Sequence, residues 1–228
     1  MRLVLFDIDG TILTARAGRR ALAAALTAVY GTSGDIERYD LRGRTDPRIV
    51  FDLMEGAGLT RPVVRERLDD CFEVYARGLA AEVGDGSGVV TLPGVADLVR
   101  RLDGAPEVLV GLLTGNIEAG ARIKLEPTGL RPYFRLGAYG SDHLDRRQLP
   151  SLAARRAQAL TGRSFLPEKV VVIGDTPHDI ECARHFGAVA VAVATGQYAR
   201  EALEAEQPDL LFDNFSDVED ALTKLLSR

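Results

Sequence analysis

The stretch that decides the fold is Leu3-Val4-Leu5-Phe6-Asp7-Ile8-Asp9-Gly10-Thr11, near the start of the chain. Four apolar residues ahead of a glycine turn predict a buried strand that ends at Asp7. Open α/β sheets bind ligands beyond the carboxyl ends of their strands, so Asp7 and Asp9 would face a ligand site. Such carboxylates suit a hard divalent cation, and a carboxylate beside a phosphate can attack phosphorus. A strand followed by an acidic surface turn explains the same residues, so the rest of the chain has to decide.

From residue 90 onward, short apolar runs alternate with segments of helical periodicity. We expect strands at residues 108–113, 136–139, 170–173, 189–194 and 210–212, and helices at residues 95–102, 117–127, 150–160 and 179–186. Alternation of this kind predicts parallel strands joined by right-handed helical crossovers. The predicted fold class is therefore α/β, with a doubly wound, Rossmann-like parallel sheet.

Between the first strand and this alternating region, the pattern becomes helical. Apolar residues recur at helical spacing over residues 17–29 and again over residues 64–79, where they predict one longer helix. Pro47 suits the first turn of a helix between them, and we find no convincing strand. The glycine-rich residues 84–88 have the composition of a hinge. We therefore predict a core domain of residues 1–14 and 84–228, with an inserted α-helical cap domain of residues 15–83.

Two later strands also end in polar residues. Residues 108–113 are followed by Thr114-Gly115-Asn116, which can cradle phosphate oxygens at a helix N-terminus, although Thr114 or Asn116 could also simply cap that helix. Residues 170–173 are followed by Asp175 and by Asp179, which is also a candidate N-cap. Four carboxylates at one sheet edge would repel strongly unless a cation neutralised them.

This combination resembles the haloacid dehalogenase-like (HAD) superfamily of hydrolases. The first motif of that family is matched by Asp7-Ile8-Asp9-Gly10-Thr11, the second by Thr114-Gly115-Asn116, and the fourth by Gly174-Asp175 with Asp179. The resemblance covers essentially the whole chain, because the helical insertion after the first motif is similar to the family's cap. The cap and the segment Gly43-Arg44-Thr45-Asp46 are similar to the phosphoglycolate phosphatase branch.

The resemblance implies a magnesium-dependent phosphatase that acts on a small phosphorylated metabolite. Asp7 would be the nucleophile that forms an aspartyl-phosphate, and Asp9 the general acid and then the general base. Magnesium would bind Asp7, the main-chain carbonyl of Asp9, and Asp175, while Asp179 would orient waters or a side-chain cation. Dehalogenases lack the second aspartate, so Asp9 favours phosphoryl chemistry.

The third motif departs from the family pattern, which has a lysine, often in Lys-Pro-x-Pro. The region here reads Asp145-Arg146-Arg147-Gln148-Leu149-Pro150, in which Arg147 and Pro150 fit the register. Lys124, on the helix after Thr114, is the other candidate, but helix rise alone places it roughly 12 to 15 Å along the axis. We therefore expect Arg147 to bind the phosphate and Lys124 to play a supporting part.

The cap loop is expected to meet the substrate through Arg44 and Thr45. Arg44 could pair with a carboxylate or a second anionic group, although an ordinary surface charge explains it equally well. Two other functions stay open. A phosphomutase of the β-phosphoglucomutase type would protect its phospho-aspartate from water, and a non-catalytic protein would use the same fold to bind a partner.

The composition and charge of the chain argue against a nucleic-acid-binding protein and against a membrane protein. The chain has 228 residues, of which 46% are hydrophobic and 27% charged, as in ordinary globular proteins. A net charge of −5 argues against nucleic-acid binding, and no apolar run approaches the about 20 residues of a membrane helix. No signal peptide is readable, and Cys71 and Cys182 lack metal or redox spacing. We expect a soluble cytoplasmic monomer or homodimer that binds neither nucleic acid nor membrane.

Overall fold

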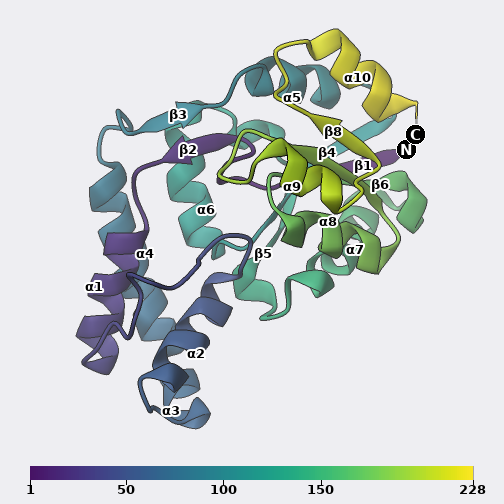
Figure 1. The fold of residues 1–228 in the computed structure, drawn as a ribbon. Helices are drawn as coiled ribbons and strands as arrows, with labels where there is room; N and C mark the ends of the chain where they lie inside the picture. The colour runs from purple at the N-terminus through teal and green to yellow at the C-terminus, as the bar shows by residue number, and fades with distance from the viewer. Residues whose placement is uncertain (228) are drawn as a thin grey trace.

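The core of the protein is a six-stranded parallel sheet. The structure is a computed structural model that describes residues 1–227, drawn in Figure 1. In sheet order the strands are β5 (Leu136–Tyr139), β4 (Val108–Thr114), β1 (Arg2–Phe6), β6 (Val170–Gly174), β7 (Val189–Val193) and β8 (Leu210–Phe212). Every neighbouring pair is parallel, and β1 lies between β4 and β6. This confirms the predicted doubly wound parallel sheet.

Both faces of the sheet are covered by helices. Side chains of β1 alternate between the faces, so that Val4 and Phe6 join one apolar cluster and Leu3 and Leu5 join the other. The first face is covered by α5 (Val95–Asp103), α6 (Glu118–Leu125) and α10 (Val218–Leu226). The second is covered by α7 (Leu149–Thr161), α8 (Pro177–Phe186) and α9 (Arg200–Ala205). Burial on both sides explains why the strands are continuous apolar runs.

A separate helical lobe lies at the lower left of Figure 1. It contains α1 (Arg19–Tyr30), α2 (Asp46–Gly56), α3 (Arg61–Glu66) and α4 (Leu68–Val83), which share an apolar cluster. The prediction of one helix over residues 64–79 is wrong, because α3 ends at Glu66 and α4 begins at Leu68, with Arg67 between them. Val64 and Leu68 keep their helical spacing across the break, so periodicity could not reveal it.

The two chain segments that join the lobe to the core lie side by side. β2 (Leu13–Ala15) and β3 (Val89–Thr91) form an antiparallel pair, which the sequence analysis does not predict. This pair lies near the predicted boundaries of the inserted segment, and the division into core and cap domains stays a prediction. The sequence analysis also does not predict α9 and α10.

The remaining regular elements are short. They are the 3₁₀ helices η1 (Glu126–Thr128), η2 (Arg131–Tyr133), η3 (Gly140–Asp142), η4 (Arg146–Gln148) and η5 (Pro167–Lys169). Within residues 1–227, no helix is both long enough and apolar enough to cross a membrane.

Candidate active site

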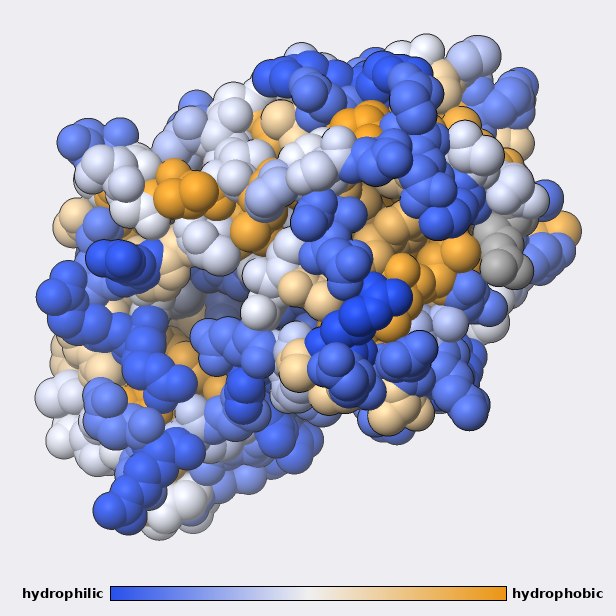
Figure 2. Space-filling model, turned by 45° about the horizontal axis from the view of Figure 1, so that its top comes forward, coloured by the Kyte–Doolittle hydropathy of each residue, from blue (hydrophilic) through white to orange (hydrophobic). Residues whose placement is uncertain are grey.

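The loops that follow β1, β4 and β6 meet at one edge of the sheet because these strands are neighbours. Asp7 follows β1, Thr114 ends β4, and Asp175 follows β6. All three residues line a cavity of about 640 Å³, whose opposite wall is formed by the helical lobe. Figure 2 shows the surface hollowed between the two parts of the molecule, with mostly hydrophilic side chains around the hollow. The convergence predicted from the sequence is therefore present.

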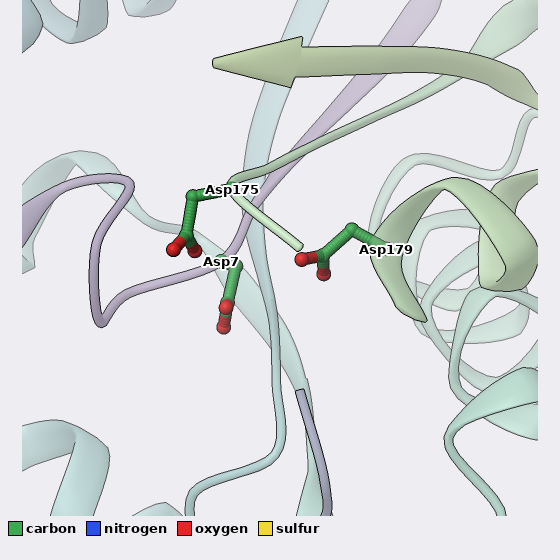
Figure 3. Close-up of side chains that lie close together, drawn as sticks. All are labelled: Asp7, Asp175 and Asp179. Carbon is green, nitrogen blue, oxygen red and sulfur yellow. The ribbon is translucent and has the colours of Figure 1, made fainter. Parts of the chain in front are cut away.

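Three buried carboxylates lie together, and two of them, Asp7 and Asp175, line the cavity. Oxygen atoms of Asp7, Asp175 and Asp179 all lie within 4.8 Å of one another (Figure 3). Burial raises the pKa of Asp7 to about 6. The positive charge of Arg146 acts to lower this pKa, and the negative charges of Asp179 and Asp9 raise it further. Burial, followed by the charges of Asp179 and Asp7, raises the pKa of Asp175 well above its usual value. The cluster therefore favours a bound proton or a cation.

The donor set fits a divalent metal ion. Oδ1 of Asp7 is buried and has no hydrogen-bond partner among the described residues. Asp175 is enclosed by the chain so tightly that a Cβ atom at Gly10 or Gly196 would overlap its carboxylate. Oxygen ligands of this kind are the ones that Mg²⁺ prefers. The carboxylates of Asp7 and Asp175 are thus available to a cation.

Arg146, and not Arg147, is the arginine at this site. Its guanidinium is buried, with Nη2 at 2.5 Å from Asp179 Oδ1 and 3.3 Å from Asp7 Oδ2. Burial acts to lower the pKa of Arg146, but the charges of Asp179 and Asp7 raise it above its usual value. A permanently charged group therefore lies against the proposed nucleophile.

The expectation for Arg147 is corrected by the structure. Arg147 is half exposed, pairs with Asp145 at 2.9 Å, and is absent from the described residues that line the cavity. Asp145 caps η4 by accepting a hydrogen bond from the Arg147 backbone N–H. Successive side chains on such a turn point in different directions, so only one of two adjacent arginines can enter the cavity.

Lys124 reaches the site, contrary to the distance argument. Its Nζ lies 2.7 and 2.9 Å from the two carboxylate oxygens of Asp9 and 2.7 Å from Oδ1 of Asn116. α6 begins only at Glu118, and helical side chains lean toward the N-terminus of their helix. The buried ammonium group therefore contacts Asp9 and not Asp7.

The segment after β4 forms a polar loop. Nδ2 of Asn116 donates to Oγ1 of Thr114 and to Oδ2 of Asp9, both at 2.8 Å. The N-cap of α6 is Ile117, whose side chain makes no capping hydrogen bond, so Thr114 and Asn116 are not helix caps. After β6, Oδ1 of Asp175 accepts a hydrogen bond from the Thr11 hydroxyl at 3.3 Å. Thr114, Gly115 and Asn116 all line the cavity.

Asp179 has two structural partners. It is the third residue of α8, where its carboxylate accepts hydrogen bonds from the backbone N–H and the hydroxyl of Thr176 in a capping box. Its other oxygen pairs with Arg146. The expectation that Asp179 is the N-cap is corrected, because Thr176 is the N-cap and Asp179 is the third helical residue of the capping box. The capping box does not account for the ion pair with Arg146.

The helical lobe contributes Arg44 to the cavity wall but not Thr45. Arg44 lies over the ring of Tyr39, with its guanidinium carbon 5.3 Å from the ring centre, and Nη1 is 3.6 Å from Asp52. Thr45 is the buried N-cap of α2 and donates to the Leu144 carbonyl at 2.8 Å. It is not among the described residues that line the cavity, so the expected substrate contact of Thr45 is corrected.

Comparison with known proteins identifies the family. The family model for HAD-hydrolase-like proteins matches residues 148–218. Over 231 aligned residues the chain is 32% identical to a phosphoglycolate phosphatase of Synechococcus elongatus, and the alignment covers 99% of each chain. The chain belongs to the HAD-like hydrolases. A phosphoglycolate phosphatase of Salmonella typhimurium is 26% identical over 245 residues, covering 97% of this chain and 92% of the relative. The protein is thus a HAD-like phosphatase.

Solved structures show the same fold. CbbY from Rhodobacter sphaeroides, in complex with phosphate, superposes on this HAD-like phosphatase with a TM-score of 0.71 at 18% identity, covering 96% of each chain. A hydrolase from Pseudomonas syringae superposes with a TM-score of 0.70 at 20% identity, covering 99% of each chain. The fold is therefore shared with these two proteins over nearly the whole chain.

The sequence analysis did not predict two residues that lie at the site of this HAD-like phosphatase. Arg146 lies at helical spacing before Leu149, Ala153 and Ala157, three of the four buried residues of α7, and this spacing could have indicated that Arg146 is buried. Asp46 is a buried carboxylate of the helical lobe that lines the cavity. In the sequence, Asp46 appears only as the last residue of the segment Gly43-Arg44-Thr45-Asp46, and nothing there indicates its contact with the loop after β4.

Proposed function

We propose that the protein is a magnesium-dependent phosphatase that hydrolyses a small phosphomonoester through an aspartyl-phosphate on Asp7. The observation that carries this proposal is the environment of Asp7. One of its carboxylate oxygens has no hydrogen-bond partner among the described residues, and the other lies 3.3 Å from the buried Arg146. A free oxygen beside a fixed cation suits a nucleophile that must approach an anionic phosphate.

The chemistry uses the two aspartates of the first motif in turn. A carboxylate oxygen of Asp7 forms a bond to phosphorus while the bond from phosphorus to the leaving oxygen breaks, and Asp9 donates a proton to that oxygen. Asp9 then takes a proton from a water molecule that attacks the aspartyl-phosphate. This step releases inorganic phosphate and restores Asp7.

The phosphoryl group would be held from the opposite side by the loop after β4. Thr114, Gly115 and Asn116 line the cavity opposite Asp175, and Arg146 faces Asp7 from the third side. Magnesium would be held by Asp7, the main-chain carbonyl of Asp9, and Asp175. When bound, it would neutralise part of the negative charge shared by the phosphate and Asp7.

The leaving group would occupy the part of the cavity lined by the helical lobe. Arg42 and Arg44 line this part, and Arg44 would pair with an anionic group of the substrate. Phosphoglycolate, the substrate named for the relatives, is the first compound to test. A cytoplasmic location and a monomeric or homodimeric state stay predictions from the sequence.

The direct test is a panel of small phosphomonoesters with magnesium, scored by release of inorganic phosphate. The panel contains phosphoglycolate, several sugar phosphates and p-nitrophenyl phosphate. We expect turnover of at least one metabolite. A phosphoenzyme that outlives the turnover of a sugar phosphate would instead indicate a phosphomutase, and no turnover across the panel would support a non-catalytic protein.

Magnesium should stabilise the folded protein because it would bind carboxylates that burial and mutual repulsion disfavour as anions. At a concentration 100 times its dissociation constant, a ligand adds about 2.7 kcal/mol to the free energy of unfolding. We therefore expect the thermal midpoint to rise with magnesium and to fall back with a chelator. Asp175→Asn should remove most of this shift. Asp213→Asn, at an exposed ion pair with Arg200, should retain it. An equal shift in both variants would contradict the metal site.

A further inference from the structure

The cap segment of residues 43–46 touches the core at the loops that form the site. The Gly43 carbonyl accepts a hydrogen bond from Nη1 of Arg146 at 3.3 Å, and Thr45 donates to the Leu144 carbonyl at 2.8 Å. Asp46 makes two further bonds, both to the loop after β4. This short segment therefore connects the helical lobe to several parts of the cavity wall.

The two bonds of Asp46 lie on either side of Asn116. The backbone N–H of Asp46 donates to the Gly115 carbonyl at 2.8 Å, and its Oδ2 accepts from the Ile117 backbone N–H at 2.8 Å. Residues 115–117 belong to neither β4 nor α6, so no regular element fixes their backbone. A single residue of the cap thus holds both peptide groups that flank Asn116, one through its backbone N–H and the other through its carboxylate.

The packing around these bonds leaves no space for side chains. A Cβ atom at Gly115 would overlap the Arg44 carbonyl oxygen, and a Cβ atom at Gly140 would overlap the Gly115 carbonyl oxygen. The Gly140 backbone N–H also donates to the Asn116 carbonyl at 2.8 Å. The loop after β4 is therefore held closely between the cap segment and the start of η3.

Asp46 is also part of the charge arrangement of the site. It is only 8% exposed, and burial raises its pKa to about 6, while the charge of Lys124 acts in the opposite direction. Burying a carboxylate is costly unless hydrogen bonds or an opposite charge compensate for it. The Ile117 N–H and the nearby Lys124 provide that compensation at the phosphate loop.

We propose that Asp46 is a positioning residue for the phosphate-binding loop, which it holds in its receptive conformation through Gly115 and Ile117 when the cap segment is docked. The inference rests on the proposed function, in which Thr114, Gly115 and Asn116 bind the phosphoryl group. It adds that a residue of the cap, without touching the phosphate, completes that site. Phosphate affinity therefore depends on a contact between the two parts of the molecule.

The test measures binding of inorganic phosphate by calorimetry in the presence of magnesium, together with kcat and KM for p-nitrophenyl phosphate. Asp46→Ala should weaken phosphate binding by roughly 10- to 100-fold, the range for losing a hydrogen bond to a charged group. Asp46→Asn keeps an acceptor for the Ile117 N–H and should restore most of the affinity. Asp46→Ser places its oxygen too close to the backbone to reach Ile117, and it serves as a second truncation if the alanine variant does not fold.

Thr45→Val is the matched control on the same segment. It removes the hydrogen bond to Leu144 and the cap of α2 without touching the loop after β4. We expect it to lower the thermal midpoint and to change phosphate affinity by less than about threefold, since it removes no contact to that loop. If Thr45→Val lowers phosphate affinity as much as Asp46→Ala does, then any contact that docks the cap segment has this effect. That result would overturn the inference.

Thr114→Val separates this inference from the proposed function. We expect it to lose phosphate binding because its hydroxyl belongs to the site itself. Unchanged binding in Thr114→Val would overturn the phosphate site and the inference with it. Loss of binding in Thr114→Val with wild-type affinity in folded Asp46→Ala and Asp46→Ser would overturn the inference alone.

Discussion

Asp7→Asn should abolish hydrolysis of phosphomonoesters while the protein stays folded. Asparagine has the shape of aspartate, so the packing at the end of β1 should be kept, but its amide is not a nucleophile. Removing a residue that forms the covalent intermediate typically lowers kcat by at least about 10⁴-fold. The measurement is the rate of p-nitrophenyl phosphate hydrolysis at saturating magnesium. Activity near that of the wild type would remove Asp7 from the mechanism.

Asp7→Asn should also change how the stability of the folded protein depends on pH. In the folded protein the pKa of Asp7 is raised to about 6, above its ordinary value of 3.8. A carboxyl with a raised pKa binds its proton more tightly in the folded state, so its ionisation lowers stability as pH rises from about 4 to about 6. In the absence of magnesium, Asp7→Asn should remove this part of the pH dependence of the denaturation midpoint.

Arg146→Ala should lower turnover by roughly 100- to 1000-fold, the usual cost of losing an electrostatic stabiliser of the transition state. The guanidinium lies against Asp7 and Asp179 in a buried position, so its loss would leave both carboxylates without their cation. Arg146→Lys should recover part of the rate, because lysine keeps the charge but lacks the fork that contacts two groups at once.

Arg147→Ala is the matched control for this experiment. The two arginines are adjacent, but Arg147 points outward and pairs with Asp145, so its loss should change kcat by less than about twofold, as at ordinary surface positions. Because removing one partner of a buried ion pair also destabilises the protein, rates are compared per folded molecule. A larger loss in Arg147→Ala than in Arg146→Ala would return the role to Arg147.

The fold and the convergence of the acids could be predicted because each depends on a regular pattern. The run before Asp7 is apolar at every position, as a strand buried on both faces requires. Parallel strands bring their carboxyl ends to one edge, so Asp7, Thr114 and Asp175 had to be close. These inferences need only the type and order of the elements, which the sequence expresses over many residues.

The predictions about the site were wrong where the answer depended on a single residue position or on the direction of a single side chain. Counting from Pro150 selected Arg147, whereas the helical spacing of Arg146 to the buried positions Leu149 and Ala153 in α7 indicates Arg146. The distance argument for Lys124 started the helix too early and ignored the lean of its side chain. The contacts of Asp46 depend on how the lobe is seated on the core, and no local pattern encodes that arrangement.

The antiparallel pairing of β2 with β3 has a consequence for how such proteins diversify. Leu13 pairs with Thr91, so the chain leaves the sheet layer and returns to it at adjacent points. A segment whose two ends are held together can be exchanged for another of different length without moving β1 or β4. We expect that transplanting another lobe at this point would change substrate preference, provided that the new lobe also makes the contact of Asp46 with the loop after β4.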